Sequence, residues 1–143
     1  MNDDDRKKEI IKELILKEED VIKKFERLVK LAANFIEIEE TTGRVLIKNE
    51  IDLSYPEKIF LIALGKYFAH HYEIIDDYSI SIQELGEELG GIPVSNFSKS
   101  LSKHVDDKIL NRQEKGIYKI NPYQIEKYLR LLDRKYIQVK NVE

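Results

Sequence analysis

Residues 82–101, with the sequence IQELGEELGGIPVSNFSKSL, decide the fold of this chain. They predict two short helices, the first ending at Gly90-Gly91 and the second opening at Pro93 and running to about Asp107. The two glycines give the backbone the freedom that a sharp turn needs. The apolar side chains of both helices are expected to fill the corner between them: Leu85, Leu89, Ile92, Phe97 and Leu101.

The segment before this stretch predicts a longer helix and a short strand. Ser54 is expected to be the N-cap, with Pro56 in the first turn and Glu57 three residues after the cap. The helix is expected to run to about His71. After an acidic loop, residues 79–82 predict a short strand, with Ser81 or Ile82 opening the next helix.

The segment after it predicts a hairpin and a final helix. Two strand-like runs, at 109–113 and 117–120, flank a turn that contains Gly116. Asn121-Pro122 is a cap followed by Pro at the first helical position. The expected apolar stripe of this last helix is Ile125, Leu129, Leu132 and Tyr136.

The order helix, short strand, helix, turn, helix, hairpin resembles the winged helix-turn-helix domains common in small archaeal DNA-binding and regulator-like proteins. The resemblance covers about residues 35–138, because Thr42-Gly43-Arg44-Val45 and the helix at 59–66 look like a module that often precedes such domains. It implies an α+β, mainly helical fold with a winged helix-turn-helix at 54–122. Asp107-Lys108 departs from the pattern, which often has Gly there.

The resemblance also implies how double-stranded DNA would bind. The helix opening at Pro93 would enter the major groove, and the hairpin at 109–120 would reach the phosphates or the minor groove. Asn binds adenine through two hydrogen bonds, Lys reaches guanine acceptors, and Ser bonds to phosphate or base. The residues expected to contact DNA are Ser95, Asn96, Lys99, Ser102, Lys103, Arg112, Lys115 and Lys119.

The charge distribution fits a DNA-binding site in the last third of the chain. The net charge of the whole chain is -3. Residues 51–88 carry 2 basic and 8 acidic side chains, whereas residues 89–143 carry 11 basic and 6 acidic. We therefore expect moderate affinity for DNA, with a strong dependence on salt, in a transcriptional regulator or DNA-associated protein.

The N-terminal residues 5–34 predict one long helix, because no Gly or Pro interrupts them and apolar residues recur at heptad spacing. Such a helix would be about 45 Å long, more than a small domain covers. We therefore expect residues 1–34 to be a coiled-coil-like dimerisation arm, which together with the last helix pairs across a two-fold axis in a homodimer. The alternative is that the stripe packs on the chain's own domain. The residues expected at the dimer contact are Ile11, Leu14, Ile15, Val21, Ile22, Phe25, Leu28 and Val29.

A second hairpin is expected between this arm and the winged domain. Phe35–Glu40 and Arg44–Lys48 are rich in β-formers and flank Thr41-Thr42-Gly43. An isolated hairpin is only marginally stable, so this one must pack on a helix or join another sheet. The hairpin and its connection then occupy residues 35–53, and a C-terminal helix and tail occupy residues 123–143.

Several function classes are not expected from the sequence. Without Cys there is no disulfide, zinc-thiolate site or cysteine nucleophile. No catalytic triad, phosphate loop or dinucleotide fingerprint occurs, so we expect neither an enzyme nor a cofactor. His70-His71 predict no metal site, because adjacent helical residues point about 100° apart. The longest apolar run, Ile59–Leu64, is too short to span a membrane, and we expect a cytoplasmic protein. The open alternative for function is a winged-helix module that binds a protein and not DNA.

Overall fold

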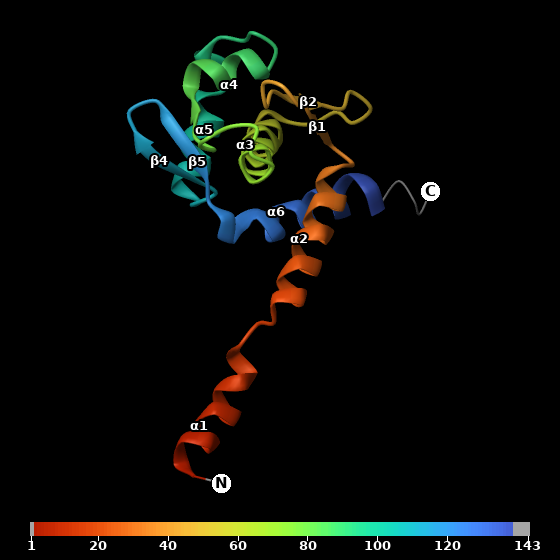
Figure 1. Cartoon of the computed structure of the whole chain (residues 1–143). Helices are drawn as coiled ribbons and strands as arrows, with labels where there is room; N and C mark the ends of the chain where they lie inside the picture. The colour runs from red at the N-terminus through yellow and green to blue at the C-terminus, as the bar shows by residue number, and fades with distance from the viewer. Residues whose placement is uncertain (1, 139–143) are drawn as a thin grey trace.

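The computed structural model describes residues 2–138. The helix α3 (Tyr55–His71) lies at the centre of the fold, and most of the elements after residue 35 pack around it (Figure 1). The Ser54 hydroxyl accepts a hydrogen bond from the Glu57 backbone N–H, and the Glu57 carboxylate accepts one from the Ser54 backbone N–H. This capping box confirms the predicted start of the helix. Residues 59–66 are buried on every face of α3.

The first hairpin packs on α3, as a marginal two-stranded sheet must. Its strands are β1 (Ile36–Ile38) and β2 (Val45–Ile47), paired antiparallel with Ile36 opposite Ile47. A Cβ atom on Gly65 would lie only 2.3 Å from a methyl carbon of Val45. Gly65 therefore lets the hairpin approach the α3 backbone closely, and the predicted hairpin is confirmed.

The second sheet has three antiparallel strands in the order β3-β5-β4. Its strands are β3 (Ile80–Ser81), β4 (Leu110–Glu114) and β5 (Ile117–Ile120). The predicted turn between β4 and β5 is confirmed, with Gly116 at a φ of 78°. Between β3 and β4 the chain forms α4 (Ile82–Glu88) and α5 (Ser98–Asp106).

The second predicted helix begins later than the sequence suggested. Pro93 is extended, a 3-10 turn follows at Val94–Asn96, and the α-helix α5 starts only at Ser98. Phe97 has a φ of -128°, outside the helical range, and its side chain is completely buried. The backbone therefore changes direction at Phe97, and this change places the aromatic ring in the core before the α-helix begins.

The C-terminal segment is helical in three different forms. Asn121 caps a 3-10 turn at Pro122–Gln124, as predicted, and α6 (Ile125–Leu132) follows. The chain then continues as a π-helix over Asp133–Gln138. The predicted stripe packs inward, with Ile125, Leu129 and Leu132 buried. Of the C-terminal segment 123–143, residues 139–143 lie outside the described residues.

The N-terminal segment is helical over most of its length, but the prediction of one continuous helix is wrong. The helix α1 (Asp3–Ile11) passes into a 3-10 turn at Lys12–Leu14, and α2 (Glu18–Ala32) begins after extended backbone at residues 15–17. The three acidic residues at the start of α2 are favoured at the positive end of a new helix, but not in the middle of a long one. A helix without packing partners is also only marginally stable.

One core connects the hairpin, the four helices α3 to α6 and the three-stranded sheet. Phe35, Phe60 and Phe97 are its largest fully buried side chains, and Phe60 stacks on Tyr128 with ring centroids 4.1 Å apart. The fold is thus α+β and mainly helical, as predicted. In the described part of the chain, no helix combines the length and the apolar character needed to cross a bilayer.

Candidate nucleic-acid interface

The corner between α4 and α5 positions the residues expected to contact DNA. The Ser81 hydroxyl caps α4 by accepting a hydrogen bond from the Glu84 backbone N–H at 3.0 Å. Gly90 and Gly91 follow α4 with φ values of 107° and 77°, a conformation that favours glycine. Leu85, Phe97 and Leu101 are buried in the corner, so the outer side of α5 has a fixed direction.

Five of the expected residues lie on the outside of this corner, and all five are exposed. Ser95 and Asn96 belong to the 3-10 turn before α5, and Lys99, Ser102 and Lys103 belong to α5 itself. Asp106, at the end of α5, is also exposed. The arrangement presents amide, hydroxyl and ammonium groups, the donors and acceptors that read base edges and phosphates.

The hairpin β4–β5 carries the other three residues, and α5 packs against β4. Arg112 and Lys115 are exposed. Lys119 differs from them, because its Nζ lies 2.7 Å from an oxygen of Asp77 and 4.7 Å from the centroid of the Tyr78 ring. The hydrogen bond from Lys119 holds the pKa of Asp77 below its usual value, and the same bond raises the pKa of Lys119. Lys119 is therefore tied to the loop before β3, while the other seven expected residues are exposed.

At the end of α5, a residue other than glycine adopts the left-handed backbone conformation that glycine usually supplies. Lys108 has a φ of 62°, in the left-handed region. Its carbonyl oxygen accepts a hydrogen bond from the Asn121 side chain at 2.8 Å. The side chain of Lys108 is exposed and adds a positive charge between α5 and β4. Asp106 and Asp107 beside it reduce the net charge of this region.

His104 holds α5 from the inner side of the helix. Its ring is buried, and Nε2 donates a hydrogen bond to the carbonyl oxygen of Pro56 at 2.6 Å. Burial lowers the pKa of His104, and the hydrogen bond to Pro56 and the charge of Asp107 only partly oppose this shift. His104 thus fixes α5 to the first turn of α3.

Glu57, next to Pro56, fixes the C-terminal segment to the same turn. Its carboxylate accepts hydrogen bonds from the Tyr136 hydroxyl at 2.5 Å and from Lys135 Nζ at 3.0 Å. Burial alone would raise the pKa of Glu57, but the hydrogen bonds from Tyr136, Ser54 and Lys135 outweigh it and lower the pKa. The first turn of α3 therefore anchors both α5 and the residues after α6.

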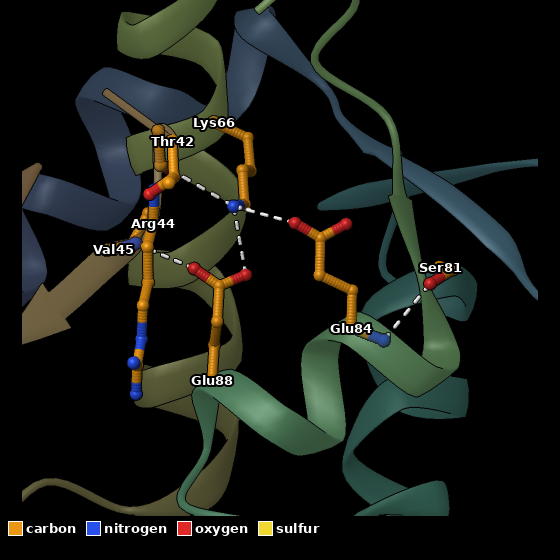
Figure 2. Close-up of polar contacts among 8 residues, drawn as sticks. Thr42, Arg44, Val45, Lys66, Ser81, Glu84 and Glu88 are labelled. Carbon is orange, nitrogen blue, oxygen red and sulfur yellow. Dashed lines mark hydrogen bonds and ion pairs between the residues drawn. The ribbon is translucent and has the colours of Figure 1, made fainter. Parts of the chain in front are cut away.

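A buried ion network behind α4 was missed in the sequence (Figure 2). The side chain of Lys66 is 3% exposed, and its Nζ lies 2.8 Å from Glu84 Oε1 and 2.9 Å from Glu88 Oε2. Nζ also donates a hydrogen bond to the Gly43 carbonyl oxygen at 3.1 Å. Glu88 Oε1 accepts one from the Val45 backbone N–H at 2.6 Å.

The network joins three elements that are distant in sequence: the first hairpin, α3 and α4. Burial raises the pKa of Glu88, although the bonds from Val45 and Lys66 favour its charged form. A sequence signal existed, since Lys66 directly follows the apolar run at 59–65 and Glu84 and Glu88 are four residues apart on one helix. The partner of such a lysine, however, depends on tertiary packing.

The residues expected at a dimer contact occupy both helices of the N-terminal segment. Seven of the eight are exposed: Ile11, Leu14, Ile15, Val21, Ile22, Phe25 and Val29. Leu28 instead packs against the chain's own core. On the same side, Lys24 forms an ion pair with Glu126 of α6 at 3.0 Å. The contact of α2 with the last helix thus forms within one chain, and a separate apolar stripe is left exposed.

The histidine pair at the end of α3 is part of an aromatic cluster. The His71 ring packs against Phe25 and Tyr67, and His70 Nδ1 lies 3.2 Å from the Ile75 carbonyl oxygen. Within residues 2–138, no group of three or more His, Cys, Asp or Glu side chains is placed to hold a metal ion.

Comparison with protein families, with curated protein sequences and with solved structures gives no match for this chain.

Proposed function

We propose that this chain is a winged helix-turn-helix protein that binds double-stranded DNA as a pair of chains joined through their N-terminal helices, and that it acts as a transcriptional regulator or DNA-associated protein. The observation that carries the proposal is the corner α4–α5 followed by the hairpin β4–β5 in a β3-β5-β4 sheet. In a winged helix-turn-helix, the second helix of the corner enters the major groove, and the hairpin is the wing.

The exposed groups on α5 and the hairpin have the chemistry that this mode of binding needs. Asn96 would bind adenine through its amide, and Lys99 and Lys103 would reach guanine acceptors or phosphates. Arg112 and Lys115 would contact the phosphate backbone beside the groove. The acidic residues Asp106, Asp107 and Glu114 limit the positive charge, which supports moderate affinity and a strong dependence on salt.

The test is the binding of mixed duplex DNA at several salt concentrations, measured for the wild type and for the double variant Lys99→Ala and Arg112→Ala. We expect weaker binding at every salt concentration and a salt slope that is reduced by about 1 for each lost phosphate contact. Lys30→Ala is the matched control, because Lys30 is exposed on α2 and pairs only with Glu26. The control should bind like the wild type.

A second candidate function is a winged-helix module that binds a basic segment of another protein. The observation that favours it is an open pocket of about 410 Å³ in which acidic side chains outnumber basic ones. Its charged lining consists of Lys66, Arg44 and four carboxylates from the hairpin and α4: Glu39, Glu84, Glu87 and Glu88. Such a pocket fits a lysine or arginine side chain. Absence of binding to duplex DNA even at low salt would reject the first proposal and favour this one.

A further inference from the structure

Residues 3–17, the outer part of the N-terminal segment and called the arm from here on, expose large apolar side chains that no other residue within 2–138 covers. Leu14 is 83% exposed and Ile10 is 72% exposed, and Ile11, Ile15 and Leu16 are exposed as well. In Figure 1, α1 extends away from the rest of the molecule. Exposed apolar side chains that cluster in this way mark a surface made for a partner.

The exposed apolar side chains continue on α2. Val21, Ile22, Phe25 and Val29 are all exposed, and their spacing places them on one face of this helix.

We propose that two copies of this chain exchange their arms: the arm of each copy runs antiparallel along the exposed face of α2 of the other. The inference rests on the pairing of two chains proposed above and does not depend on DNA binding. Each copy then offers one arm and one exposed face of α2, so the contact is self-complementary and closes with two-fold symmetry.

The lengths of the two segments support this arrangement. Residues 3–14 and residues 18–29 are both helical, and each segment is about 18 Å long at 1.5 Å per residue. The extended residues 15–17 lie between them. A two-fold axis beside this break therefore superimposes the arm of one copy on the exposed face of α2 in the other.

The charges favour the antiparallel over the parallel direction. Residues 6–12 of the arm contain four basic and one acidic side chain. With the axis beside residue 16, Arg6, Glu9 and Lys12 of one copy lie opposite Glu26, Lys23 and Asp20 of the other copy, so opposite charges meet at these three positions. In a parallel arrangement the two basic segments lie side by side. Like charges at such contacts are destabilising.

The absence of Cys from the chain allows a direct test with single cysteines and a short thiol-reactive cross-linker. Leu16→Cys lies beside the proposed axis and should cross-link to itself in high yield. Ile10→Cys and Ile22→Cys should each cross-link poorly alone, but a mixture of the two should give the mixed dimer, because residues 10 and 22 are equally far from the axis. Efficient cross-linking of Ile10→Cys to itself would show parallel arms and overturn the proposal.

The molecular mass in solution completes the test. The wild type should be a dimer at micromolar concentration, and the variant Leu14→Glu with Ile15→Glu should be a monomer with unchanged thermal unfolding of residues 35–138. A monomeric wild type whose arm folds back on its own α2 would overturn the proposal. These measurements contain no DNA, so a protein that cross-links as expected but fails to bind duplexes would refute only the proposed function.

Discussion

The arm and the central helix α3 use the same apolar residue types, but they bury them to opposite extents. Leu14 in the arm is 83% exposed, whereas Leu64 in α3 is fully buried. The difference lies in the surroundings, because α3 is enclosed by the hairpin, two helices and a sheet of its own chain. The same apolar pattern on a helix can thus be buried or exposed, and the other elements of the fold decide which.

The largest effect should come from breaking the buried network of the central region. Lys66→Met leaves Glu84 and Glu88 without their counter-ion, and removing one partner of a buried ion pair costs about 3–5 kcal/mol. Urea unfolding at pH 7 measures this loss in the free energy of unfolding. Lys30→Met is the control on α2, where the exposed pair with Glu26 should contribute less than about 0.5 kcal/mol. A loss below 1 kcal/mol for Lys66→Met would mean that the network does not stabilise the fold.

The comparison of the two leucines can be tested by the same substitution at both sites. Leu64→Ala removes a fully buried side chain and should lower the free energy of unfolding by about 2–5 kcal/mol. Leu14→Ala should change it by less than about 0.5 kcal/mol when the protein is dilute, because an exposed side chain loses little. At high concentration Leu14→Ala should instead weaken self-association, which sedimentation measures. Equal losses at both sites in dilute solution would contradict the contrast between the two regions.

The smallest effect should be a pH dependence that arises inside the central region. Because burial lowers the pKa of His104, the unfolded chain takes up a proton near pH 6.5 while the folded chain does not. The contribution of His104 to the free energy of unfolding should therefore be constant above pH 7. As the pH decreases from 6.5 toward 5, the free energy of unfolding should fall by up to about 1 kcal/mol per pH unit. Chemical unfolding at pH 7, 6 and 5 measures the slope.

One variant identifies the residue responsible for this slope. His104→Gln keeps an N–H donor for the Pro56 carbonyl oxygen but cannot titrate, so it should flatten the slope. A slope that persists in His104→Gln would assign the pH dependence to another group.

Local capping signals in the sequence predicted three helix or turn starts correctly. Ser54 with Glu57, Ser81 and Asn121 all cap the helices or turns that they were expected to open. Such signals work because the hydrogen bonds of a cap join residues only two or three positions apart. The two hairpins were predicted for the same reason, since turn residues and alternating β-formers lie next to each other in the chain.

Prediction from the sequence failed where the structure depends on residues far apart in the chain or on the absence of packing. Lys66 finds its partners 23 positions earlier and 18 to 22 positions later, and no local pattern specifies them. The pairing of Lys119 with Asp77 is equally remote. The break at residues 15–17 contains neither Gly nor Pro, and it occurs where all three side chains are exposed, so packing does not stabilise a long helix there.

The first turn of α3 has a mechanical consequence. Two consecutive residues hold two separate parts of the molecule: the Pro56 carbonyl oxygen holds α5 through His104, and the Glu57 carboxylate holds the residues after α6 through Tyr136 and Lys135. Both parts are attached to the same turn, so two adjacent residues determine the angle between α5 and the C-terminal segment. A force that tilts the C-terminal segment therefore also acts on the hydrogen bond that attaches α5 to α3.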